Sequence, residues 1–239
     1  LMESDFEKYQ SFWKHFGRHI KYGVVSDFGM HKEILQDLLI FHSSAVNGYT
    51  TLKDYVSRMK EDQKFIYYAC GESIQQIALL PQTELCRDKG YEMLYLPEDV
   101  DEFAVQALMQ FEEKPFKSVT ADDAQLQSEE EKKETEKQQE ENKELLAFVK
   151  EALGEKIAKA VISDKLKSHP VCMTAEGPVT IETEKYFASV PGDEMKPKAV
   201  KVLELNASHK AFAALKDAYK IDKEKARNYA QLLYNQALL

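Results

Sequence analysis

Between residues 65 and 119 the sequence alternates short β-rich runs with helix-like segments, and this alternation constrains the fold more than any other feature. The run FIYYAC at 65–70 ends at Gly71, as a buried strand would. Two helix-like segments lead to a second strand-like run at 91–96, and another helix separates it from a third strand at 116–119. Strands that alternate with helices predict a small, mainly parallel sheet between layers of helices.

The first sixty residues have the apolar spacing of amphipathic helices. A second expected helix carries apolar residues from Ile34 to Phe41, and a third begins at Thr51, where Asp54 completes a capping-box pattern. The first helical stripe would normally pack against an earlier part of a chain, which indicates a fragment. This stripe consists of Phe6, Tyr9, Phe12, Phe16 and Ile20. We predict a helical connector over 1–62 and a small α/β subdomain over 63–124.

The run EEEKKETEKQQEENKE at 129–144 breaks the composition of the chain with eight Glu and four Lys. It is either an acidic interaction tract or a solvated helix with Glu–Lys pairs, and we favour the helix. Apolar residues continue this helix until Gly154 ends it. Strand-like runs at 157–163, 171–174 and 200–205 follow, with helices between and after them. An α+β domain is therefore predicted over 125–239.

Charge and cysteine usage exclude several classes of protein. The formal net charge of -9 disfavours binding to DNA, RNA or anionic membranes. No apolar run approaches the roughly 20 residues that span a bilayer, and no secretion signal is present, so a cytoplasmic protein is expected. Cys70, Cys86 and Cys172 are odd in number and widely spaced, which fits neither a disulfide framework nor a zinc site.

Signatures of catalysis and of cofactor binding are missing from the sequence. Neither a GxxxxGK[ST] loop nor a GxGxxG loop occurs. His15 and His19 have metal-ligand spacing, but no third ligand is near them. Cys70 before Gly71 is interpreted as a packed thiol rather than a nucleophile. We predict no catalytic, cofactor-binding or metal-ligating residue in this chain.

Two adjacent aromatic residues, Tyr186 and Phe187, lie in a short helix-like segment between Gly177-Pro178 and Pro191-Gly192. They could project as part of a partner-binding surface, or they could pack into the core. The residues alone favour packing into the core, because most apolar helical stripes are buried.

Six runs carry a resemblance to known proteins: FWKHFGRHIKYG at 12–23, YVSRMKEDQKFIYYACGES at 55–73, KGYEMLYLPEDVDEFAVQAL at 89–108, SDKLKSHPVC at 163–172, LELNASHKAF at 203–212 and LLYNQALL at 232–239. Together they resemble, in order, the ninety-kilodalton heat-shock chaperone family of the HtpG type. The family has an N-terminal ATP-binding domain, a middle domain and a C-terminal dimerisation domain. The resemblance covers only the later middle part and the C-terminal part.

The resemblance implies where clients and a second subunit would bind. In bacterial relatives an acidic-aromatic pair and an amphipathic helix hold client proteins, although some relatives have Met at two of these helix positions. These sites correspond to Glu102, Phe103, Val179, Thr183, Tyr186 and Phe187. Dimerisation would involve Tyr229, Leu232, Leu233 and Leu238. Because the family's last helix is absent from the sequence, we expect dimerisation to be weakened or rearranged.

The resemblance also implies the function. We expect a fragment that binds partly folded clients and contributes to homodimerisation, with no enzyme activity and no cofactor of its own. ATP and Mg would bind in the absent N-terminal domain of an ATPase parent. The alternatives are a stand-alone enzyme that acts through Cys70 or scattered carboxylates, and a purely structural dimerisation scaffold.

Overall fold

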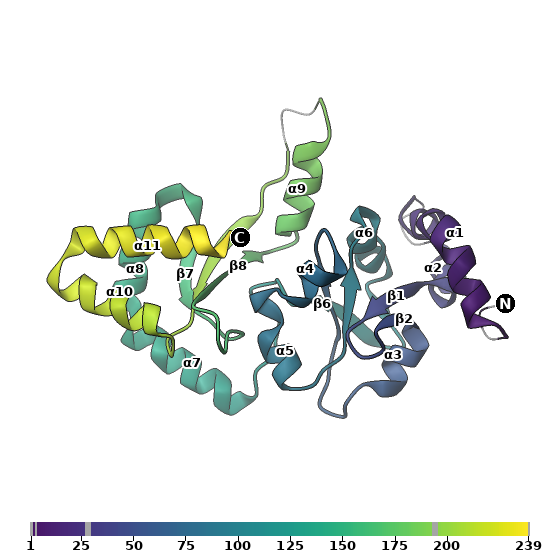
Figure 1. The fold of residues 1–239 in the computed structure, drawn as a ribbon, viewed down its shortest axis with the longest axis horizontal. Coiled ribbons are helices and arrows are strands. Elements are labelled where there is room, and N and C mark those ends of the chain that lie inside the picture. The colour runs from purple at the N-terminus through teal and green to yellow at the C-terminus, as the bar shows by residue number, and fades with distance from the viewer. Residues whose placement is uncertain (1, 3, 27–29, 193–195, 239) are drawn as a thin grey trace. The chain divides into compact units, whose positions relative to one another are not determined.

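The computed structural model describes residues 2, 4–26, 30–192 and 196–238, and Figure 1 shows its elements. The chain forms two compact units. The first unit contains Leu1–Leu79 and Lys89–Val119, and the second contains Leu80–Asp88 and Thr120–Leu239. Residues 80–88 therefore come from the middle of the first unit's sequence but pack within the second unit.

A mixed sheet forms the centre of the first unit, in the order β2-β1-β4-β3-β6-β5. The strands are β1 (Ile40–Ser43), β2 (Gly48–Thr51), β3 (Ile66–Cys70), β4 (Met93–Leu96), β5 (Gln110–Phe111) and β6 (Lys114–Ser118). The three predicted strands are β3, β4 and β6, and they pair in parallel. All four residues of β4 are buried, as expected for an interior strand covered on both faces. The predicted mixed α/β fold is confirmed.

Helices cover this sheet, and the longest of them is α1. They are α1 (Phe6–Ser26), α2 (Lys32–Leu35), α3 (Leu52–Arg58), α4 (Ile74–Ala78) and α6 (Asp99–Leu108), with a 3₁₀ turn η1 (Gln36–Leu38). Helix α1 buries Tyr9, Trp13 and Val24 in the core of the first unit. Thr51 caps α3 by accepting a hydrogen bond from the backbone N–H of Asp54 at 3.0 Å, as the capping-box pattern predicts.

The helix predicted from Ile34 to Phe41 is wrong at its C-terminal end. Helical structure ends at Leu38, and Ile40 begins β1, where Phe41 pairs with Thr50 across an antiparallel hairpin. The apolar residues at 34–41 have helical spacing, but only Leu39, Ile40 and Phe41 are buried, where the chain enters the sheet. Ile34 and Leu38 stay exposed. The predicted helical connector thus also supplies two strands.

The second unit contains a three-stranded sheet in the order β7-β9-β8. Its strands are β7 (Lys159–Ile162), β8 (Val171–Glu176) and β9 (Val200–Leu205). Its helical elements are η2 (Pro81–Thr83), α5 (Glu84–Asp88), α7 (Glu129–Glu141), α8 (Lys143–Leu153), η3 (Gly154–Lys156), α9 (Ile181–Ser189), α10 (Lys210–Ile221) and α11 (Lys223–Ala237). The core lies between the sheet and helices α8, α10 and α11.

The acidic run forms α7, which buries none of its side chains. Ser128 caps this helix in a capping box with Glu131, and Lys143 pairs with Glu140 at 3.3 Å on the surface. The solvated-helix interpretation is therefore confirmed. Gly154, with φ of 60°, ends α8, and Asp222 caps α11, both as predicted. Helix α10 is capped by His209, whose side chain accepts a hydrogen bond from the backbone N–H of Ala211.

Residues 80–88 are held in the second unit by the carboxylate of Glu84. It accepts hydrogen bonds from the backbone N–H groups of Lys167 at 2.7 Å and Ser168 at 3.1 Å, and from the Ser168 hydroxyl. The Nδ1 atom of His169 lies 2.8 Å from the same carboxylate. Burial alone would raise the pKa of Glu84, but the hydrogen bonds from Ser168, Lys167 and His169 outweigh it and lower the pKa to about 2. We call this arrangement the Glu84 clasp.

A buried cluster of charges joins Lys165, in the loop after β7, to Glu204 on β9. The ammonium group of Lys165 is 2.9 Å from a Glu204 carboxylate oxygen and 2.5 Å from an Asp164 oxygen, and it donates to the Asp122 carbonyl at 3.2 Å. Glu204 also accepts a hydrogen bond from Thr174 at 2.9 Å. Burial lowers the pKa of Lys165, but the two carboxylates outweigh burial and raise it, so the ammonium stays charged.

Candidate functional site

Helix α9 carries four of the six predicted client-binding residues within or just before it. Thr180 caps it by accepting a hydrogen bond from the backbone N–H of Thr183 at 3.0 Å. Glu184 accepts from Lys201 Nζ at 2.7 Å and from the Ala199 N–H at 2.6 Å. Burial raises the pKa of Glu184, but these two bonds outweigh burial, so the pKa is lowered. The polar side of α9 is thereby tied to the start of β9.

The other side of α9 presents a pair of aromatic rings. Tyr186 and Phe187 are both half-buried, and their rings meet edge to face with centroids 5.3 Å apart. Val190, just after the helix, is exposed. In Figure 1 this helix extends away from the three-stranded sheet of its unit. The pair retains accessible apolar surface, as a partner-binding segment would.

The remaining members of the predicted set differ in accessibility. Val179 is half-buried and Thr183 is buried. Glu102 and Phe103 lie on α6 in the first unit, where Glu102 is only 5% exposed and Phe103 is half-buried. Of the acidic-aromatic pair, the ring of Phe103 therefore offers more surface to a partner than the Glu102 carboxylate does.

The first turn of α6 is anchored by a buried cation from α1. Lys21 Nζ lies 2.5 Å from an Asp101 carboxylate oxygen and 3.2 Å from a Glu98 oxygen. The same ammonium lies over the Trp13 ring, 5.4 Å from its centroid. Burial raises the pKa of Asp101 to about 6, although Lys21 opposes that shift. Lys21 thus holds the helical turn that carries Glu102. The sequence did not single out Lys21, because a lysine in an amphipathic helix is usually on the surface.

The four predicted dimerisation residues divide between surface and core. Leu232 is 62% exposed and Leu238 is 55% exposed, whereas Leu233 is 6% exposed and packs in the core of its own unit. Tyr229 is half-buried and lines a shallow cavity of about 340 Å³ between α10 and α11. Ile221, at the end of α10, lines the same cavity and is highly exposed. Ile221 was not among the residues predicted from the sequence, although its position as an apolar residue just before the Asp222 cap was a usable signal.

The histidines and cysteines weighed above as metal ligands or nucleophiles lie either on the surface or, at least in part, in the packed interior. His15 and His19 are exposed on α1, and the described residues contain no group of three or more His, Cys, Asp or Glu able to hold a metal ion. Cys86 and Cys172 are buried thiols, and burial raises the pKa of Cys86 to about 12. Cys70 is a half-buried thiol. Within the described part of the chain, no helix is long and apolar enough to span a membrane.

Comparison with known proteins gives consistent matches. The family model described as Hsp90 protein matches residues 1–239. The chaperone protein HtpG of Clostridium acetobutylicum is 52% identical over 239 residues, and that of Clostridium perfringens is 53% identical. HtpG of Bacillus subtilis is 50% identical over the same length. Each match covers 100% of this chain and 38% of the relative, so the chain spans less than half the length of these relatives.

Proposed function

Because this chain belongs to the Hsp90 protein family, we propose that it is a chaperone segment that holds partly folded client proteins and helps to join two subunits. The observation that carries the proposal is the aromatic pair of α9, whose rings pack on each other and remain partly accessible. Apolar anchors of this kind bind partly folded chains without requiring one client sequence.

The proposal assigns the chain to the later middle part and the C-terminal part of the family. The six runs that resemble the family support this assignment, and so does the division into two compact units. On this assignment ATP and Mg bind outside the chain, in a parent ATPase, and the parent acts in the cytoplasm. Of the six predicted client-binding residues, the contacts proposed here are those with accessible surface, Phe103, Val179, Tyr186 and Phe187. Glu102 and Thr183 are buried.

The first test measures how well the chain suppresses aggregation of a heat-unfolded model protein, with and without ATP. We expect suppression that ATP does not change. Changing both Tyr186 and Phe187 to Ala should raise the amount of chain needed to suppress aggregation by about fivefold or more, since apolar anchors dominate such binding. The matched control is Phe12→Ala with Phe16→Ala, which removes a partly exposed ring pair stacked at 5.0 Å on α1.

Equal losses in the two double variants would contradict the client site on α9. Circular dichroism of each variant separates loss of binding from loss of folding. ATP binding by the isolated chain would contradict the assignment within the family, because it would place the nucleotide-binding region inside these residues. No suppression by the unmodified chain would favour the purely structural scaffold.

Subunit joining is proposed to use the exposed leucines in α11 and just after it, Leu232 and Leu238. We expect weak self-association that depends on concentration, and Leu232→Ser with Leu238→Ser should weaken it about a hundredfold, because four leucines per dimer would lose apolar contacts. Sedimentation equilibrium measures the change. The control is Leu79→Ser, which removes an exposed leucine of the first unit. Unchanged association in the double variant would contradict this interface.

A further inference from the structure

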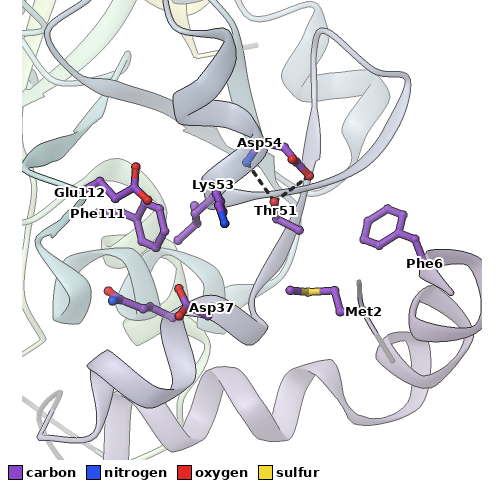
Figure 2. A pocket seen from close by; sticks show the side chains of 10 residues that line it. Met2, Phe6, Asp37, Thr51, Lys53, Asp54, Phe111 and Glu112 are labelled. Atoms are coloured by element: carbon purple, nitrogen blue, oxygen red, sulfur yellow. Dashed lines mark hydrogen bonds between the residues drawn. The ribbon is translucent and has the colours of Figure 1, made fainter. Parts of the chain in front are cut away.

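The first unit holds an open cavity and a buried ion pair that lie outside the six predicted client contacts. The cavity, of about 540 Å³, lies between Met2 and Phe6 on one side and Phe111 on the other (Figure 2). Phe6 belongs to the stripe that is expected to pack against an earlier part of a chain, so this cavity is assigned no ligand. The ion pair joins Lys21 on α1 to Asp101 on α6 and is buried within the unit itself.

Asp101 is the residue through which α1 holds the first turn of α6. One of its carboxylate oxygens lies 2.5 Å from Lys21 Nζ, and the other accepts a hydrogen bond from the Glu98 backbone N–H at 3.0 Å. The side chain of Asp101 is 1% exposed and that of Lys21 is 4% exposed. Water screens such a pair little, and removing either charge leaves the other buried without its partner. The start of α6 is therefore fixed against α1.

The same contact sets which way α6 faces. Successive residues of an α-helix are rotated by about 100°, so Phe103, two positions after Asp101, points about 200° away from it. Ala104, Val105 and Leu108 share the buried face with Asp101, at the spacing of one helical stripe. An inward Asp101 therefore leaves the ring of Phe103 on the outer side of the helix, where it is half-buried.

We propose that Lys21 is a positioning residue for client binding, whose ion pair with Asp101 holds α6 in the orientation that presents Phe103. This inference rests on the proposed chaperone function and deepens it, because it adds a residue that no client touches. The rings of Trp13 and Phe41 lie around the ammonium, with centroids at 5.4 and 5.8 Å. Lys21 therefore acts through Asp101 and α6 rather than by contact with a client.

The positioning contact has a defined pH dependence. Burial raises the pKa of Asp101 to about 6, although Lys21 opposes that shift. The ion pair is therefore formed at about pH 7.5 and largely lost at about pH 5, where the carboxyl is protonated. Burial and Lys21 lower the pKa of His42, the nearest histidine on the sheet. The other charged or titratable side chains on the surrounding elements are Arg18 on α1, Glu98, Asp99 and Glu102 on α6, Tyr49 on β2 and Tyr95 on β4.

The first readout is the fluorescence of Trp13, the single tryptophan of the 239-residue chain, whose ring lies beside the Lys21 ammonium. We expect its emission to change with a midpoint at about pH 6 in the unmodified chain. The change should be absent from Lys21→Met and from Asp101→Asn, which has the charge of the protonated carboxyl. A transition with the same midpoint in Asp101→Asn would come from a histidine and would overturn the proposal.

The second readout is the affinity for a rhodamine-labelled peptide of leucine, phenylalanine and serine, measured by fluorescence anisotropy. The peptide has no ionisable side chain, so any pH dependence comes from the chain. At about pH 7.5 we expect Lys21→Met and Asp101→Asn each to weaken binding about fivefold. Lys14→Met, which removes an exposed charge from the same helix, should change it less than about twofold. At about pH 5 the unmodified chain should bind as weakly as Asp101→Asn.

A double variant decides whether Lys21 acts through Phe103. If it does, Lys21→Met should weaken binding no further in a chain that already carries Phe103→Ala. Equal losses with and without Phe103 would overturn the proposal, and so would binding that Phe103→Ala leaves unchanged. Circular dichroism verifies folding, and Asp101→Asn, whose carbonyl oxygen can still accept from the Glu98 N–H, replaces Lys21→Met if that variant does not fold. Suppression of aggregation that depends on the α9 rings would persist in each of these cases, so the two proposals fail separately.

Discussion

Replacing Glu84 with alanine should lower the free energy of unfolding of the second unit by about 3 kcal/mol. This figure follows from a pKa lowered from 4.5 to about 2, at about 1.4 kcal/mol per pKa unit. The alanine would also leave the backbone N–H groups of Lys167 and Ser168 without their acceptor. Urea unfolding followed by circular dichroism measures the loss, and hydrogen exchange of residues 80–88 and 165–169 locates it.

The same substitution has a matched control and a defined pH dependence. Asp88→Ala, on the same helix, removes only a surface pair with Lys167 at 3.6 Å and should cost less than about 1 kcal/mol. Because the folded pKa of Glu84 is lowered, its stabilisation is present above the unfolded pKa of 4.5 and disappears as the pH falls towards about 2. The difference between the unmodified chain and Glu84→Ala should therefore shrink over that range. A difference that stays constant down to pH 2 would contradict an ionic clasp.

Replacing Lys165 with methionine should destabilise the second unit by about 3–5 kcal/mol, because Glu204 and Asp164 would lose their buried counter-charge. Adding Glu204→Gln should recover part of this loss. The glutamine is neutral, and its carbonyl oxygen can still accept the hydrogen bond from Thr174. Urea unfolding of the single and double variants measures the coupling between the two positions.

A surface lysine on the neighbouring strand provides the control for this experiment. Lys159 pairs with Asp122 at 3.1 Å and with Glu176 at 3.0 Å, but its side chain is 42% exposed, whereas that of Lys165 is fully buried. Lys159→Met should cost less than about 1 kcal/mol. If Lys159→Met and Lys165→Met lower the free energy of unfolding equally, burial does not explain how much the charge cluster around Lys165 stabilises the second unit.

Neighbouring residues show how far the site could be predicted. The family resemblance placed Leu232 and Leu233 together on a dimerisation surface, yet Leu232 is exposed and Leu233 packs in the core. An apolar pair on a helix does not reveal which member faces the core, because helical positions one apart point in different directions. The helix that carries Tyr186 and Phe187 was predicted correctly, but the partial exposure of their rings was not apparent from the residues, which favoured burial. No local sequence pattern indicated that Glu84 and Lys165 form buried ionic contacts.

The sequence by itself determined the elements whose interactions lie within a few residues. These include the cap at Thr51, the end of α8 at Gly154, the cap at Asp222 and the solvated helix at 129–141, as well as membership of the family. Only the tertiary structure decided which side chains are buried and which segments, distant in the sequence, contact one another. In the Glu84 clasp, the carboxylate of Glu84 contacts residues that follow it in the sequence by 83–85 positions. These contacts hold residues 80–88 in the second unit. Such contacts depend on where distant parts of the chain pack, which no local pattern records.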